Sequence, residues 1–162
     1  MLMFRNICPE EEGLIRETAL MEQEIFPDPW SSREIASTAA QKQTFCMAAL
    51  ENEEVQGYFF CYYVLDECEI ARIAVRASCR RSGLGRRLLS EMEEKCSSLG
   101  IRRIMLEVRE SNMPAISFYR KNGFVTEGRR RGYYPGSPPE DAVLMGKELP
   151  AVPTGTEPLA DV

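Results

Sequence analysis

A short stretch near the middle of the chain, residues 80–87, combines glycine and arginine in the order RRSGLGRR. Apolar residues with helical spacing follow it directly, at Leu88, Leu89, Met92 and Cys96. Glycine lets backbone N–H groups approach a ligand closely, and a helix N-terminus offers unpaired N–H donors and a partial positive charge. Arginine adds forked donors that suit phosphate oxygens. The stretch therefore predicts a site for a multiply charged anion.

Three phosphate-binding patterns can be compared with this stretch. A P-loop requires a lysine after its last glycine, and no lysine follows Gly85 at that spacing. The dinucleotide fingerprint requires a third glycine or alanine where Leu88 stands. A third pattern has Gln or Arg, then two residues, Gly, one residue, and Gly or Ala, and Arg80, Gly83 and Gly85 satisfy it. This pattern is weak by itself, and a glycine turn before a solvated helix start is the alternative.

The elements that position the loop follow from hydrophobic periodicity and capping residues. We expect helices over residues 10–23, after Ser31 or Ser32, from the loop to about Leu99, and from Ser111 or Asn112 to Asn122. We expect strands over residues 44–50, 55–65, 69–75, 104–108, 124–126 and 142–145, with an Arg-, Tyr-, Pro- and Gly-rich loop between the last two. This order predicts a mixed α/β sheet with helices on its faces.

Size and composition indicate one globular domain. The chain has 162 residues, of which 44% are hydrophobic and 28% charged. We expect a single domain over residues 1–149 and a disordered tail over 150–162, which holds three prolines and few hydrophobic residues. The net charge of −5 argues against general nucleic-acid binding, although the arginines are locally clustered.

Residue content argues against several classes of site and location. Histidine is absent from the chain, which argues against a zinc site and against His-based triads, and we expect no metal. The six cysteines, at positions 8, 46, 61, 68, 79 and 96, form no CxxC pair and are expected to be reduced, mostly buried thiols of a cytoplasmic protein. No apolar run is long enough to cross a membrane, and no secretory signal is evident.

Residues 72–87 and 104–145 together resemble the GNAT superfamily of N-acetyltransferases, and within it the RimI-type ribosomal-protein N-terminal alanine acetyltransferases. The matching segments are Ile73-Ala74-Val75, Arg80 to Arg86, Leu106-Glu107-Val108-Arg109, Ser111-Asn112, Phe118-Tyr119, Asn122-Gly123-Phe124, Gly132-Tyr133-Tyr134 and Glu140-Asp141-Ala142. The segment from Phe26 to Ser31 is similar to the Phe-Pro and Trp-Ser loop of that family. The combination is much more specific than the glycine loop.

The resemblance implies the GNAT fold, in which a central, mostly antiparallel sheet splays at an acetyl-CoA cleft. It implies acetyl-CoA as co-substrate, with its pyrophosphate in the backbone cradle formed by Arg81, Ser82, Gly83, Leu84, Gly85 and Arg86. It also implies that Ile73, Ala74 and Val75 run beside the pantetheine arm, with the Val75 N–H as an oxyanion donor. Asn112 matches a further cofactor contact, and plain helix capping is its alternative role.

The resemblance also implies the groups that move protons. Glu107 matches the general base, and on an alternating strand it points away from Leu106 and Val108. A strand glutamate paired with an arginine is the alternative interpretation of Glu107. Tyr119 matches the general acid that protonates the departing thiolate, although an aromatic on such a helix is more often a core residue.

The expected acceptor is the N-terminal amine of a protein, an alanine on a small-subunit ribosomal protein. Trp30, Tyr133 and Tyr134 are candidate walls of the acceptor slot, with covering of the core edge as the alternative for Trp30. Arg72 stands where RimI-type proteins often have Asn and could change substrate preference. Other hypotheses are acetylation of lysine side chains or small amines, and a non-catalytic acyl-CoA sensor. We expect no direct binding of nucleic acid or membrane, and a monomer or weak dimer.

Overall fold

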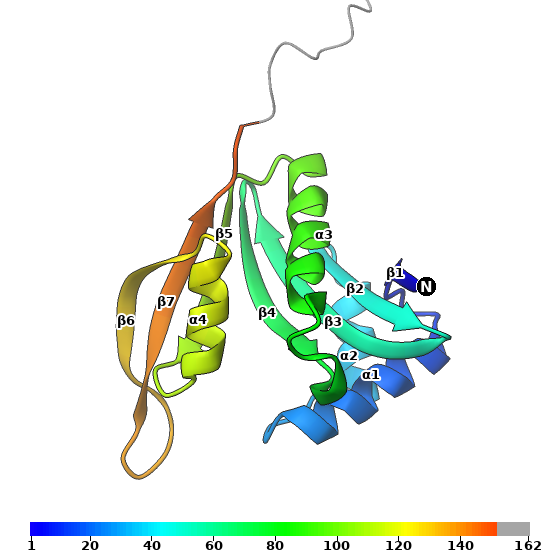
Figure 1. Cartoon of the computed structure of the whole chain (residues 1–162), viewed down its shortest axis with the longest axis horizontal. Helices are drawn as coiled ribbons and strands as arrows, with labels where there is room; N and C mark the ends of the chain where they lie inside the picture. The colour runs from blue at the N-terminus through cyan, green and yellow to red at the C-terminus, as the bar shows by residue number, and fades with distance from the viewer. Residues whose placement is uncertain (152–162) are drawn as a thin grey trace, which may run out of the picture.

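The computed structural model describes residues 1–151, which form one seven-stranded sheet flanked by helices (Figure 1). The strands are β1 (Leu2–Asn6), β2 (Thr44–Glu51), β3 (Glu54–Val64), β4 (Glu67–Val75), β5 (Arg103–Arg109), β6 (Val125–Tyr134) and β7 (Glu140–Glu148). The helices are α1 (Glu12–Ile25), α2 (Ser32–Ala40), α3 (Leu84–Ser98) and α4 (Met113–Lys121), and a short 3₁₀ helix, Ala77–Cys79, follows β4.

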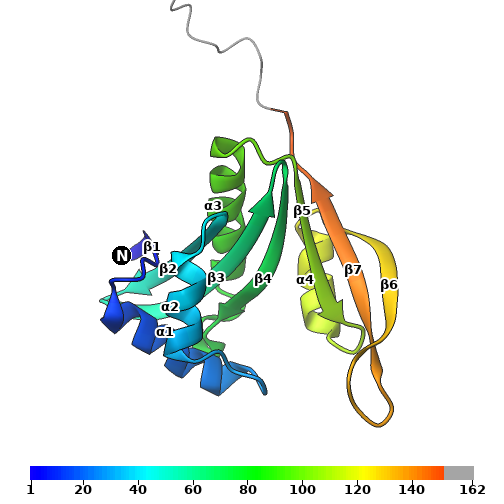
Figure 2. The same cartoon turned by 180° about the vertical axis from the view of Figure 1, so that it is seen from behind.

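The sheet order is β1-β2-β3-β4-β5-β7-β6. Strands β4 and β5 run parallel, and every other neighbouring pair is antiparallel. The front and back views together place α1 and α2 on one face of the sheet and α3 and α4 on the other (Figure 2). The predicted mixed, mostly antiparallel α/β sheet with helices on both faces is confirmed.

Strand β3 divides the core between the two faces of the sheet. Phe59 and Cys61 belong to an apolar cluster with α3 and α4, and Tyr58 and Phe60 belong to a second cluster with α1 and α2. Successive side chains of a strand point to opposite faces, so a strand covered on both sides needs an unbroken apolar run. This is why residues 57–63 read GYFFCYY without polar alternation.

Strands β4 and β5 are paired over only the first part of their length. The parallel register covers three residue pairs and ends at Glu69 opposite Met105. The register of β4 against β3 shifts just beyond this point and leaves Ala71 as an extra residue. Such a bulge bends its strand and increases the local twist. Beyond Ala71, β4 therefore turns away from β5, and the two strands separate toward Val75 and Arg109 in both views.

Two parts of the sheet correct the sequence prediction. The sequence does not predict β1, a short edge strand held by its ladder to β2. The predicted loop between residues 126 and 142 is instead mostly the hairpin of β6 and β7. Strand β6 is exposed along most of its length, so it lacks the apolar alternation from which a strand is predicted.

The other expected features of the chain have mixed outcomes. The short helix after Ser31 is confirmed, and Ser31 forms a capping box with Glu34. All six cysteines are free thiols, and four of them, at positions 46, 61, 68 and 96, are buried. None of the helices within residues 1–151 is long and apolar enough to cross a bilayer. The predicted tail lies outside the described residues from residue 152 onward.

Gly57 lies where β3, the end of β4 and α3 approach one another most closely. A Cβ atom on Gly57 would lie 2.9 Å from the carbonyl oxygen of Ala74 and 3.0 Å from the side chain of Leu88. We expect Gly57→Ala to lower the free energy of unfolding by about 1–3 kcal/mol, because main chain must move to admit the methyl group. Urea denaturation measures this difference.

Gly13 offers the matched control, because a Cβ atom there would meet nothing within 4 Å. It lies in the first turn of α1, where alanine favours the helix, so Gly13→Ala should raise stability by up to about 1 kcal/mol. An unchanged unfolding midpoint in Gly57→Ala would contradict the close approach of β3 and β4.

Candidate active site

The end of β4 presents main-chain groups along the edge that β5 leaves unpaired. The Arg76 N–H donates to the carbonyl oxygen of Gln56 at 2.8 Å, so residue 76 is hydrogen-bonded to the β3 side. Successive residues of an antiparallel strand point their N–H and C=O groups to opposite edges. The N–H and C=O groups of Val75 therefore point away from β3, and those of Ile73 do the same.

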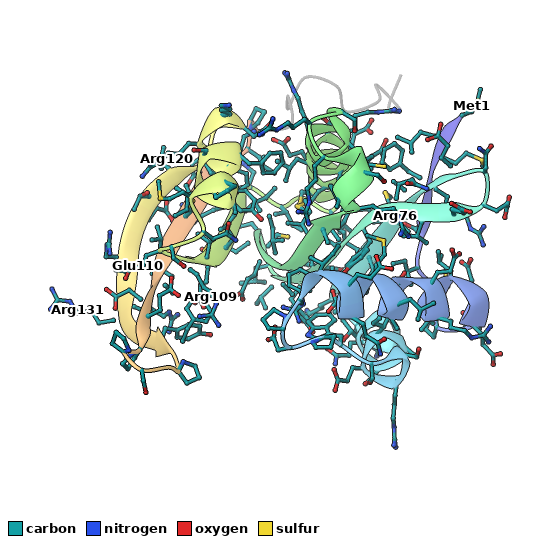
Figure 3. All side chains as sticks on the ribbon, turned by 60° about the horizontal axis from the view of Figure 1, so that its bottom comes forward. Met1, Arg76, Arg109, Glu110, Arg120 and Arg131 are labelled. Atoms are coloured by element: carbon teal, nitrogen blue, oxygen red, sulfur yellow. The ribbon has the colours of Figure 1, made fainter. Side chains whose placement is uncertain are left out.

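Figure 3 views the molecule from the end at which β4 and β5 have separated. Arg76, which follows β4, and Arg109, the last residue of β5, lie on opposite sides of that view. Helix α3 begins on the β4 side and α4 on the β5 side. Groups from both halves of the sheet can thus reach a ligand bound between them.

The RRSGLGRR stretch, residues 80–87, spans the turn into α3 and the first turn of that helix. Arg81 and Gly83 have positive φ angles of 66° and 86°, and Gly83 is the N-cap of α3. A Cβ atom on Gly83 would meet nothing within 4 Å, so the space beside the backbone is open. The first-turn N–H groups, which residues 84–86 supply, have no partner within a helix. This geometry fits a bound pyrophosphate.

Three other residues of this segment have partners inside the protein. The Arg80 Nε donates to the Val75 carbonyl oxygen at 3.2 Å, so this side chain turns back toward the end of β4. The Ser82 N–H donates to the carbonyl oxygen of Cys79 at 3.3 Å and closes the turn. A Cβ atom on Gly85 would lie 3.0 Å from the ring of Phe118. Gly85 therefore also allows α3 and α4 to pack closely.

Glu107 lies on β5 and points away from the α3–α4 cluster. Its neighbours Leu106 and Val108 are buried in that cluster, whereas 19% of the Glu107 side chain is exposed. The Glu107 Oε1 lies 2.9 Å from the Nε of Arg130, which comes from β6. Glu107 is thus paired with an arginine, as the alternative interpretation predicted. Its other carboxylate oxygen remains available to a second hydrogen-bond donor.

Two tyrosines at the end of β6 lie beside this carboxylate. A hydrogen bond to Glu107 raises the pKa of the Tyr133 phenol above its usual value. Burial raises the pKa of Tyr134, and the negative charge of Glu107 adds to this effect. The two rings meet edge to face at 5.0 Å, and the Arg130 guanidinium lies 5.7 Å from the Tyr133 ring centre. The hairpin thus brings three side chains to Glu107.

Tyr119 lies on α4 inside the α3–α4 cluster, with 7% of the residue exposed. Its ring packs against Phe118 and Phe124, each at 5.4 Å between ring centres. Burial raises the pKa of the Tyr119 phenol, and the nearby Cys61 thiol contributes in the same direction. The phenol therefore stays protonated well into the alkaline range.

Glu107 and Tyr119 do not touch each other. Within the described part of the chain, the charged and phenolic partners of Glu107 are Arg130 and Tyr133. Tyr119 reaches β5 from the α4 face and Glu107 points from the opposite face. One ligand can contact both groups only where β4 and β5 have separated.

Asn112 and Trp30 both have the structural contacts that the sequence analysis raised as alternatives. The Asn112 Oδ1 accepts from the Ala115 N–H at 3.3 Å and caps α4. The Trp30 ring packs on the Phe60 ring at 5.3 Å, beside the second core cluster. Neither contact occupies the whole side chain, so a ligand role is compatible with both.

Two charged groups that contact candidate site residues were not predicted from the sequence. Arg130 lies beyond the predicted strand at residues 124–126, in the stretch expected to be a loop, so its pairing with Glu107 was not predicted. Glu22 is fully buried on α1, three residues after Ala19 and seven after Ile15. A glutamate on the same apolar stripe as these two residues is the signal that could have revealed a buried carboxylate.

Comparisons with known proteins agree on one family. Residues 13–124 match the model of the acetyltransferase (GNAT) family. The chain is 34% identical over 126 residues to the ribosomal protein bS18-alanine N-acetyltransferase of Escherichia coli K12, covering 77% of this chain and 84% of the relative.

Solved structures give the same result. The crystal structure of the ribosomal-protein-S18-alanine N-acetyltransferase from Escherichia coli superposes with a TM-score of 0.83 at 29% identity, over 95% of this chain and 97% of that one. Arabidopsis thaliana NAA60 in complex with acetyl-CoA shares the fold, with a TM-score of 0.77 at 21% identity over 92% and 99% of the two chains. The family match spans the α3 turn, β5 and α4, and the chain belongs to the GNAT family of acetyltransferases.

Proposed function

We propose that this acetyltransferase transfers the acetyl group of acetyl-CoA to the N-terminal amine of a protein, with an alanine N-terminus of a small-subunit ribosomal protein as acceptor. The observation that carries the proposal is the unpaired edge of β4, with the α3 N-terminus on one side and the Glu107 carboxylate on the other. The Escherichia coli relative, named for the same acceptor, supports the choice of substrate.

The residues of the α3 turn and the β4 edge would hold acetyl-CoA. The backbone of residues 81–86 suits the pyrophosphate, and Ile73 to Val75 lie along the unpaired edge where the pantetheine arm would run. The Val75 N–H, which points away from β3, would donate to the thioester oxygen as negative charge develops there. Asn112 would add a contact while it caps α4.

An N-terminal amine suits the groups at this site. A free α-amino group has a pKa near 7.7–8.0 and is partly neutral at cellular pH, whereas a lysine ε-amine has a pKa of about 10.4. The site offers one carboxylate for the proton of the amine, that of Glu107, which contacts Arg130 and Tyr133. An amine that is already partly neutral asks less of this single group, so the α-amine fits the site better than a lysine side chain.

In the proposed reaction, the neutral amine nitrogen attacks the thioester carbon while Glu107 accepts a proton from it, directly or through one water. The tetrahedral intermediate then breaks its C–S bond, and the Tyr119 hydroxyl gives a proton to the departing thiolate. Trp30, Tyr133 and Tyr134 would form the walls that hold the incoming N-terminus. We place the reaction in the cytoplasm, because six free thiols fit a reducing compartment.

The acceptor class can be tested with two peptides and acetyl-CoA. One peptide has a free N-terminal alanine and no lysine, and the other has a blocked N-terminus and an internal lysine. We expect mass spectrometry to find acetylation of the first peptide alone. Acetylation of the second alone would contradict the acceptor, and cofactor binding without any product would contradict catalysis.

The proton-transfer roles predict losses of turnover without loss of the fold. Glu107→Gln and Tyr119→Phe should each lower kcat by about 100-fold, since general acid or base catalysis contributes roughly 10²–10⁴-fold. Matched controls are Glu93→Gln, which removes a charge paired with Lys147, and Tyr63→Phe, which removes the hydroxyl of a ring that packs against Phe45. Unchanged kcat in either site variant would remove the role assigned to that residue.

The raised pKa of Tyr119 predicts the alkaline side of the pH profile. A general acid is active while protonated, and burial raises this pKa above the usual value of about 10. We expect no loss of kcat from Tyr119 ionisation between about pH 8 and about pH 9.5. A fall in kcat within this range that disappears in Tyr119→Phe would contradict the prediction, with circular dichroism as the check that the protein remains folded.

A further inference from the structure

The carboxylate of Glu22 is completely buried and joins three segments of the chain. It accepts hydrogen bonds from the Tyr58 hydroxyl on β3, from the main-chain N–H of Trp30 at 2.9 Å and from the Nε of Arg72 at 3.2 Å. A buried carboxylate is costly unless its oxygens are paired and hydrogen-bonded. Glu22 therefore favours the one arrangement in which all three donors converge on it.

Arg72 on β4 uses the rest of its guanidinium to hold the segment between α1 and α2. Its Nη2 donates to the carbonyl oxygen of Asp28 at 2.6 Å. Its planar group lies 4.2 Å from the ring centre of Phe26 and 5.0 Å from that of Trp30. Only 13% of the Arg72 side chain is exposed. The fork and the flat faces of the guanidinium thus contact residues 26–30 from several sides.

The position of Arg72 gives these contacts a consequence for the site. Arg72 follows the bulge at Ala71 and directly precedes residues 73–75, in which the main-chain groups of Ile73 and Val75 face the opening. Residues 26–30 carry Trp30, one of the proposed acceptor walls. The ion pair therefore couples the wall on the acceptor side to the strand that is proposed to hold the thioester.

We propose that Glu22 and Arg72 act as a positioning pair that sets the affinity for the acceptor amine by fixing Trp30 beside β4. This inference rests on the proposed function of the site. Neither residue touches a reacting atom. Loss of the pair releases residues 26–30, so these residues must become ordered when the acceptor binds, and this cost lowers the affinity. The cofactor cradle and Glu107 keep their own supports, in α3 and in β6.

The test compares Arg72→Met with Arg72→Lys and with the double variant Glu22→Gln/Arg72→Met. Arg72→Met leaves the Glu22 charge buried with one donor fewer, and the double variant removes both charges, so it keeps the test valid if the single variant is unstable. Lysine restores the charge without the fork, so partial recovery is expected from Arg72→Lys. Arg103→Met is the matched control, because Arg103 is a partly buried arginine paired with Glu127 and Glu148 at the start of β5.

Kinetics separate positioning from a merely structural role. We expect KM for the acceptor peptide to rise about tenfold in Arg72→Met and in the double variant, while kcat and KM for acetyl-CoA change by less than about twofold. In Arg103→Met stability should fall and none of the three constants should change. The proposal would be overturned if kcat and both KM values worsened by similar factors in a folded Arg72→Met variant. An unchanged KM for the acceptor in such a variant would also overturn it.

A second readout does not require acetylation, because Trp30 is the single tryptophan of the chain. In folded Arg72→Met and in the double variant, its emission should shift to the red and acrylamide quenching should increase; in Arg103→Met neither should change. Unchanged fluorescence would overturn the proposal that Glu22 and Arg72 hold Trp30 in place, whatever the substrate is. If the unsubstituted protein acetylates no peptide, the proposed function and the link to acceptor affinity fail together. The fluorescence still decides whether the positioning pair holds Trp30 in place.

Discussion

The separation of β4 from β5 is the constraint on which the rest of the structure depends. Three parallel residue pairs join the halves of the sheet, and the bulge at Ala71 then bends β4 away. A strand that is hydrogen-bonded on only one edge must satisfy its other main-chain groups with water, with side chains or with a ligand. The N–H of Val75 is one of these groups. The unpaired edge of β4 is thus also the place where we propose that the thioester binds.

Each half of the molecule brings a different kind of group to this opening. The half with α3 contributes backbone donors, because a helix N-terminus capped by Gly83 leaves its first N–H groups free for an anion. The half with β5, β6 and β7 contributes Glu107 with its arginine and tyrosine partners. The segment after α1 contributes the ring of Trp30, whose main-chain N–H is held by the buried carboxylate of Glu22. The site is therefore an assembly of separate elements around one gap, and its precision depends on how those elements pack.

Several residues of the proposed site have a structural contact beside the chemical role proposed for them. Asn112 caps α4, Gly85 allows α3 and α4 to approach, and Glu107 is held by Arg130. Asn112 and Glu107 are residues for which the sequence left two interpretations open. The structure meets the structural interpretation in each case without excluding the chemical one, because the contacts use only part of each side chain. A carboxylate paired with an arginine, or a side-chain amide that caps a helix, is also held in a defined orientation, which catalysis and binding both require.

The sequence by itself determined most of the elements and the class of the site. Apolar periodicity, the cap at Ser31 and the glycine–arginine turn are local signals, so the helices, the inner strands and the turn before α3 could be predicted from them. Most of β6 beyond residue 126 could not, because an exposed edge strand has no apolar alternation and exists through its ladder to β7. The pairing of Glu107 with Arg130 and of Glu22 with Arg72 was likewise decided by the tertiary structure. These partners lie far apart in the chain, and only the packing of the sheet and helices determines which charges become neighbours.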